Sequence, residues 1–126
     1  TLSLCVFGNY VDGDGKVYGE IYLDNGSSYF DVENNVLTNG SATNAIFVTG
    51  GGWGNPNTSA NYNTVSNNYG STTAGVLDNA SSHTTLGTNS FSLMSWPTAA
   101  TTDINAAGLE SSYAALNPTP EVNLAL

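Results

Sequence analysis

The chain has 126 residues, which fits the roughly 100–200 residues of one domain, and only 9% of them are charged, against about 25% in an average soluble protein. A single basic residue, Lys16, opposes ten Asp and Glu, so the formal net charge is −9 and no basic surface can neutralise nucleic-acid phosphates or anionic lipid. No apolar run approaches the roughly 20 residues that span a bilayer, so we predict neither a nucleic-acid partner nor a membrane partner.

Cys5 is the only cysteine, which excludes an intrachain disulfide, a cysteine-based zinc site and an iron–sulfur cluster. It lies in an apolar alternation, where we expect a buried, unreactive thiol. Thr1 is not followed by a charged segment and an apolar core, so we expect removal of an initiator Met rather than of a signal peptide, with cleavage of a signal as the alternative.

The first 49 residues have the composition of β-structure. Apolar residues alternate over 2–6 and 28–33, and Asn25-Gly26 between the apolar run 17–23 and the next strand is typical of a type I′ hairpin. In residues 28–33, Asp31 and Glu33 are expected on one face and Phe30 and Val32 on the other. The pattern predicts an antiparallel β-meander over 1–49, with a further strand at 45–48 buried on both faces.

The remaining chain is less regular. Residues 50–82 are almost wholly Gly, Asn, Ser, Thr and Ala, which predicts a long loop region with scattered aromatic residues. Residues 83–126 predict a strand ending at Pro97, a short helix and an extended tail. Thr102 or Asp103 would cap the helix, and its apolar positions are Ala106, Leu109, Tyr113 and Leu116. No internal repeat is predicted. The expected fold is a single, mainly β domain over 1–126, an antiparallel β-sandwich or barrel-like structure with long loops and one short C-terminal helix.

Residues 12–17 partly match the calcium loop of an EF-hand. Asp12, Asp14 and Gly15 occupy consecutive expected positions, but the first ligand position is Tyr10 and the final bidentate position is Ile21. We therefore predict a tight hairpin turn and no cofactor, with a weak calcium site at Asp12 and Asp14 as the alternative.

Few residues could support catalysis. His83 is the only histidine, and no nucleophile motif surrounds a serine. Two carboxylates can hydrolyse a glycosidic bond, and Glu20, Asp31 and Glu33 lie on adjoining predicted strands, but solvated strand faces explain them as well. No catalytic residue is assigned, and the protein is not expected to be an enzyme.

Two apolar features are better explained by contacts with other chains. Trp53 lies in a run of glycines that cannot shield it, which is typical of an interface anchor and also of a sugar-stacking platform. The tail alternates apolar residues to its end, and Val122, Leu124 and Leu126 require a sheet edge to pair with. These four residues are the predicted interface.

In size and composition the chain resembles virion structural proteins of tailed bacteriophages, notably capsid decoration or cement proteins, although no motif supports the resemblance. The resemblance implies a non-enzymatic structural subunit on the virion surface, as a homo-oligomer or bound to a major capsid protein. The alternatives are a secreted carbohydrate-binding or adhesin module, which would be extracellular, and a pilus-like subunit assembled by strand addition.

Overall fold

The computed structural model describes residues 4–12, 19–38, 44–50, 59–71, 75–79 and 81–107. The chain contributes one short strand to each of three sheets in turn, and this order of three strands then repeats along the chain. The strands are β1 (Leu4–Phe7), β2 (Tyr10–Asp12), β3 (Ile21–Leu23), β4 (Phe30–Glu33), β5 (Val36–Thr38), β6 (Ile46–Thr49), β7 (Thr64–Ser66), β8 (Tyr69–Gly70), β9 (Val76–Asn79) and β10 (Thr85–Leu86).

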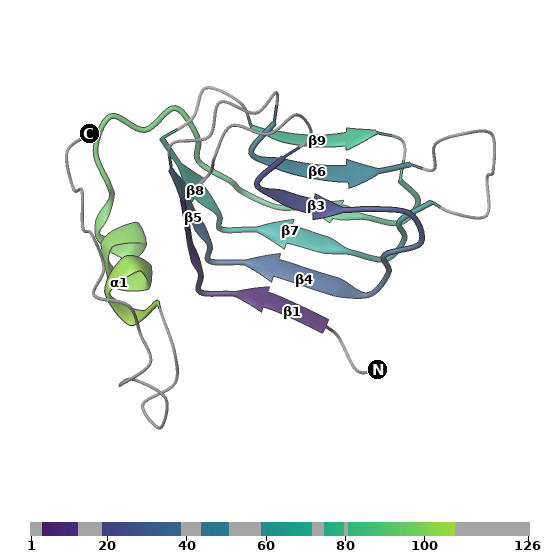
Figure 1. Cartoon of the computed structure of the whole chain (residues 1–126), viewed down its shortest axis with the longest axis horizontal. Helices are drawn as coiled ribbons and strands as arrows, with labels where there is room; N and C mark the ends of the chain where they lie inside the picture. Colours follow the sequence, from purple (N-terminus) through teal and green to yellow (C-terminus); the bar gives the residue numbers. More distant parts are fainter. Residues whose placement is uncertain are drawn as a thin grey trace.

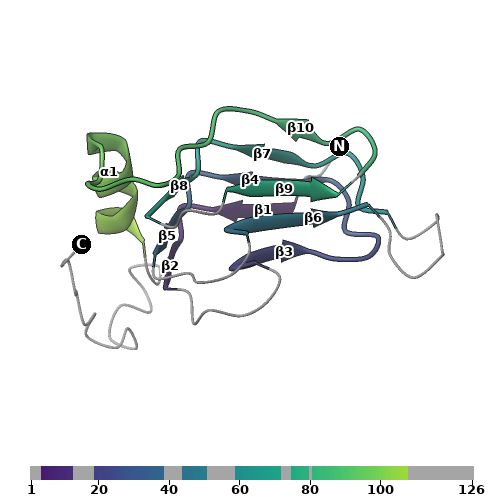
Figure 2. The ribbon, with the colours of Figure 1, turned by 90° about the horizontal axis from the view of Figure 1, so that it is seen from above.

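Each sheet collects every third strand, in the orders β1-β4-β7-β10, β2-β5-β8 and β3-β6-β9. Every pair of neighbouring strands is parallel. Figures 1 and 2 show the strands of each sheet stacked side by side along one direction. This arrangement is a parallel β-helix, in which each coil contacts the coils directly before and after it.

The predicted fold class is therefore right in its mainly β content and wrong in its pairing. Asn25-Gly26 does form a turn, in which the N–H of Ser27 donates to the carbonyl of Asp24 at 2.9 Å. Of the two central residues of this turn, Asn25 and Gly26, only Gly26 has a positive φ, 74°, which matches a type II turn rather than a type I′ turn. The turn is a corner between β3 and β4, which belong to different sheets, so the predicted antiparallel meander does not form.

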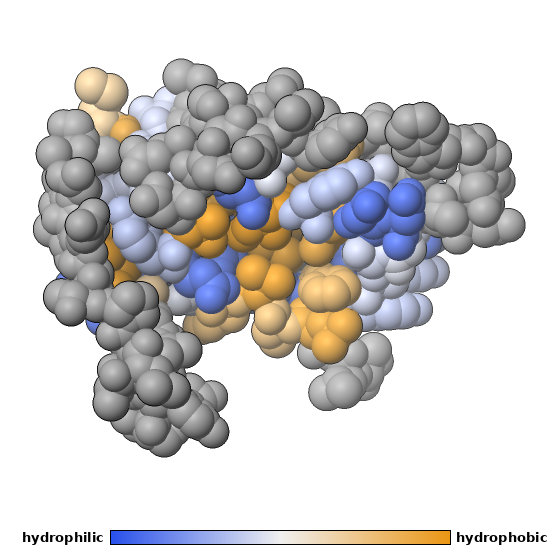
Figure 3. Space-filling view, viewed as in Figure 1, coloured by the Kyte–Doolittle hydropathy of each residue, from blue (hydrophilic) through white to orange (hydrophobic). Residues whose placement is uncertain are grey.

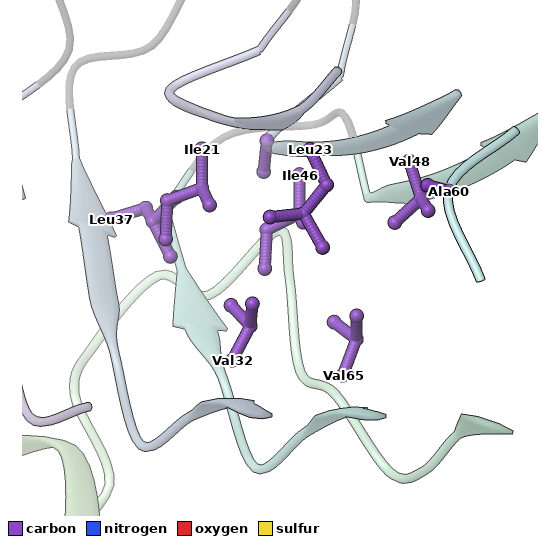
Figure 4. Close-up of a cluster of buried hydrophobic side chains, with 9 residues drawn as sticks. Ile21, Leu23, Val32, Leu37, Ile46, Val48, Ala60 and Val65 are labelled. Atoms are coloured by element: carbon purple, nitrogen blue, oxygen red, sulfur yellow. The ribbon is translucent and has the colours of Figure 1, made fainter. Parts of the chain in front are cut away.

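Inward-facing side chains from the three sheets meet in one apolar core (Figure 4). Val32 and Val65 come from one sheet, Leu37 from the second and Ile46 from the third, and all four are fully buried. Val32 and Val65 are paired in register on β4 and β7, so they stack along the coil axis. The alternation predicted for β4 is confirmed, since Phe30 and Val32 pack on the core.

Two other predicted segments agree with the structure only in part. The predicted strand at 45–48 is confirmed as β6, except that Phe47 is half-buried and stacks outside the core on Tyr22, with ring centroids 5.0 Å apart. The region 50–82 is not one loop, because it contains β7, β8 and β9. These strands are only two to four residues long and mix apolar with polar side chains, so they show no apolar periodicity from which a strand could be predicted.

The described helix, α1, spans Thr98–Ala106, directly after Pro97, which lies at the N-cap. Ala107 is extended, so the helix ends near where the predicted one was to begin; Leu109, Tyr113 and Leu116 lie outside the described residues. Helix α1 packs beside β5 and buries Ala100 (Figure 1). Among the described residues, no helix is both long and apolar enough to cross a membrane.

Candidate assembly site

Four asparagines form a ladder at the corner that follows the first strand of each coil. Asn9, Asn35, Asn68 and Asn89 come after β1, β4, β7 and β10. The Nδ2 of each of the first three donates to the Oδ1 of the next, at 2.9, 2.9 and 2.8 Å. The ladder therefore runs the length of the four described coils and holds the corners in register.

The same side chains satisfy backbone groups at the corners. The backbone N–H groups of Asn9, Asn35 and Asn68 each donate to the Oδ1 of the following ladder residue, at 3.1 Å in all three cases. The Nδ2 groups of Asn35, Asn68 and Asn89 also donate to backbone carbonyls of the preceding coil, those of Val6, Val32 and Val65. Asn35 and Asn68 are fully buried, so these hydrogen bonds satisfy polar groups that water does not reach.

The ladder and the repeat behind it were missed in the sequence. Each ladder residue follows an inward-facing Val or Leu by three positions, in Val6-Phe7-Gly8-Asn9, Val32-Glu33-Asn34-Asn35, Val65-Ser66-Asn67-Asn68 and Leu86-Gly87-Thr88-Asn89. In the middle two coils an asparagine with positive φ precedes the ladder residue, and in the first coil Gly8 does so. The signal that could have revealed the repeat is therefore an apolar β-branched or leucine residue, two variable positions and an asparagine.

Four of the eight exposed large hydrophobic side chains among the described residues lie on the first coil, and the other four, Tyr29, Tyr62, Leu86 and Met94, lie elsewhere. The three strands of the first coil, β1, β2 and β3, are the edge strands of their sheets, and they carry the residues of what we call the first-coil surface: Leu4, Phe7, Tyr10 and Tyr22. Leu4 is 53% exposed and Phe7 is 60% exposed. The turned view in Figure 2 places β1 and β3 toward the side that Figures 1 and 3 face, and Figure 3 shows apolar side chains gathered in the middle of this face.

A second exposed feature is a column of stacked rings at the corner before the first sheet. The rings of Tyr29 and Tyr62 stack with centroids 5.3 Å apart, and His83 stacks on Tyr62 at 4.5 Å. All three residues have a positive φ, between 56° and 64°, which is uncommon for residues with large side chains. Because the two faces of the Tyr62 ring are covered by its neighbours, this ring cannot serve as a stacking platform for a sugar.

The predicted carboxylates do not form a catalytic pair. Asp31 and Glu33 both point outward from β4, and Glu33 accepts a hydrogen bond from the hydroxyl of Ser66 at 2.6 Å. Glu20 precedes β3 in another sheet, where both its carboxylate oxygens are shielded from solvent and receive no hydrogen bond from the described residues. Burial raises the pKa of Glu20.

The remaining predicted residues fall in different places. Trp53, Val122, Leu124, Leu126 and Asp14 lie outside the described residues, so the interface and calcium predictions stay predictions. Asp12 ends β2. No group of three potential metal-ligating side chains occurs within the described ranges.

Two reactive side chains are at the surface. Cys5 is exposed, which corrects the predicted buried thiol, because it points outward beside Asp31 in the paired strands. His83 is also exposed, and its Nδ1 lies 2.6 Å from the hydroxyl of Ser82. Comparison of the chain with protein-family models, with curated proteins and with solved structures finds no match.

Proposed function

We propose that this protein is a non-enzymatic structural subunit of a larger assembly and that the first-coil surface is one of its contacts. The observation that carries the proposal is the exposure of Leu4, Phe7, Tyr10 and Tyr22 on the three edge strands of one coil. A solenoid needs a polar cap at each end to remain soluble as a separate unit. An apolar first coil is instead suited to being covered by another protein.

The edge strands also supply the means of attachment. Each of β1, β2 and β3 has a neighbouring strand on one side only among the described strands, so its other side is available for main-chain hydrogen bonds. A strand added there gains backbone pairing, and burial of each large side chain adds about 1.5–3 kcal/mol. Strand addition, the mode predicted for a pilus-like subunit, thus becomes part of the same proposal.

The setting that we propose is a virion, with the protein bound at the surface as a decoration or cement subunit. The support is compositional: a small chain with one basic residue and a net charge of −9, rich in neutral hydroxyl and amide side chains. In such a shell, a modest contact repeated by symmetry gives a large total stabilisation.

The proposal is tested by sedimenting gentle extracts of the native source and locating the protein in the gradient. The wild-type chain is expected in particles much larger than a monomer. A Leu4→Ser/Phe7→Ser variant, supplied in place of the wild type, should fold but shift to the monomer fraction. Tyr62→Asn is the matched control, because Tyr62 is equally exposed but lies on a middle coil, and asparagine tolerates its positive φ.

A wild-type chain that sediments only as a free monomer in the native extract would contradict the proposal. Incorporation of the double variant at the wild-type level would contradict it as well, because assembly would then not depend on the first coil.

A further inference from the structure

The two ends of the asparagine ladder differ in the hydrogen-bonding groups that they leave without partners. Within the described structure, the Oδ1 of Asn9 accepts no hydrogen bond, and its Nδ2 uses one hydrogen for Asn35 and leaves the other free. At the other end, the backbone N–H of Asn89 donates to no group in the described ranges, and its Nδ2 turns back to the carbonyl of Gly87 at 3.1 Å. One end therefore offers an acceptor, and the other end offers a donor.

These groups are the ones that pair at every junction inside the ladder. Between the second and third coils, the N–H of Asn35 donates to the Oδ1 of Asn68, and the Nδ2 of Asn68 donates to the carbonyl of Val32. If Asn9 of a second copy of the chain were placed after Asn89 in the ladder, this junction would be repeated. The N–H of Asn89 would donate to that Oδ1, and the free hydrogen of Asn9 would reach the carbonyl of Leu86, which occupies the position of Val32 in its own coil.

The apolar row beside the ladder has the same incomplete ends. Val6, Val32, Val65 and Leu86 occupy one register row of the first sheet. Val32 and Val65 are fully buried, Val6 is partly buried and Leu86 is 47% exposed. If Leu86 were placed on a second Val6, both end residues would gain the environment that the middle two already have.

Resting on the proposed function, we propose that the partner at the first-coil surface is a second copy of this chain, stacked head to tail with its β10 edge beside β1. The four groups at the junction, Val6, Asn9, Leu86 and Asn89, are uncharged, so no like charges meet there. Because the two contacting surfaces differ, the contact is heterologous and each dimer keeps one free end of each kind. The product is an open, linear assembly of many copies rather than a closed dimer.

The test is sedimentation velocity of the purified full chain from about 1 μM to about 1 mM, a range that covers weak to moderate affinities. Species larger than a dimer should accumulate as the concentration rises. Each chain carries −9 charges, so association should strengthen when salt is raised to about 0.5 M, where repulsion is screened within a few ångströms. Asn9→Ala, which removes two junction hydrogen bonds, should weaken association about tenfold.

Two variants blocked at opposite ends distinguish stacking from other association. Leu86→Lys and Leu4→Lys should each remain monomeric on their own, because every contact needs one unblocked end of each kind and a charge on an edge strand opposes pairing there. An equal mixture of the two variants should form dimers and nothing larger, because the free β1 edge of Leu86→Lys can pair with the free β10 edge of Leu4→Lys and both remaining ends are blocked. Tyr62→Asn on a middle coil should associate like the wild type.

A doubly blocked Leu4→Lys/Leu86→Lys chain should be monomeric at all concentrations, and circular dichroism should show that it keeps the wild-type strand content. A wild-type chain that remains monomeric at about 1 mM in high salt would overturn head-to-tail stacking. Association of the doubly blocked chain at the wild-type level would also overturn it. Neither outcome contradicts the proposed function, which is tested by whether the native protein is found in large particles.

Discussion

The ring of Phe91 lies against the α-carbon of Gly70 and fills the position that a side chain at residue 70 would take. A Cβ added at Gly70 would lie 2.9 Å from Cε1 of this ring. Gly70 is aligned with Leu37 on β5, so it lies in an inward-facing row. Phe91, which packs on the core, thus supplies the apolar volume that Gly70 lacks.

Gly70→Ala is expected to lower the free energy of unfolding by about 1–3 kcal/mol, because the Phe91 ring must move to make room. Gly75→Ala is the matched control, since a Cβ there would lie at an ordinary 3.6 Å from the same ring. Urea unfolding of both variants measures the difference. Equal stabilities for the two variants would show that Phe91 does not pack closely on Gly70.

Asn68→Ala should destabilise the protein by at least about 2 kcal/mol, because it leaves the buried carbonyl of Val32 and the N–H of Asn35 without partners. The neighbouring Asn67 is exposed and has a φ of 54°, so Asn67→Gly keeps the backbone conformation and should change stability little. Thermal unfolding of the pair tests the ladder. A small effect of Asn68→Ala would mean that water replaces its hydrogen bonds.

Glu20 should make the protein less stable as the pH rises above its ordinary pKa of 4.5. Below that pH the carboxyl is protonated in both the folded and the unfolded protein. As the pH increases through the raised pKa of the folded state, the folded protein must bury a charge that the unfolded chain exposes to water. Stability is therefore lost toward neutral pH.

Glu20→Gln removes this ionisation, so we expect the variant to melt above the wild type at pH 7 and to lose this advantage near pH 4. The measurement is the difference between the two melting temperatures across this range. A difference that does not vary with pH, or that grows toward acid, would contradict the assignment.

The stacked rings of Tyr29 and Tyr62 should be coupled by about 0.5–1.5 kcal/mol in a double-mutant cycle. Tyr29→Asn and Tyr62→Asn suit the cycle, since asparagine accepts the positive φ of both positions. Chemical denaturation of the wild type, the two single variants and the double variant gives the coupling. Additive effects would mean that the rings are adjacent without stabilising each other.

The sequence predicted those features of the fold that depend on residues close together in the chain. The alternation in β4, the apolar strand β6 and the turn at Asn25-Gly26 all follow from local patterns, and all are present. The direction of pairing depends instead on where the chain goes after a corner. A hairpin turn and a solenoid corner have the same turn residues, so Asn25-Gly26 alone could not distinguish the two.

The repeat was missed because its period is not constant. The ladder residues are separated by 26, 33 and 21 positions, whereas a search for repeats relies on a fixed spacing. The first-coil surface was missed for a related reason. Leu4, Phe7 and Tyr10 look like ordinary strand residues, and only the stacking of coils shows that they lie on an edge.

The unequal spacing of the ladder also describes how this fold can change without being lost. Since Asn9, Asn35, Asn68 and Asn89 fix the corners, the number of residues between successive corners can differ by as much as twelve while the coils stay aligned. Insertions between the coils therefore cost mainly the entropy of closing a longer loop, which grows slowly with length. Such segments are suitable places to graft peptide epitopes or binding loops, displayed at the spacing that the coils impose.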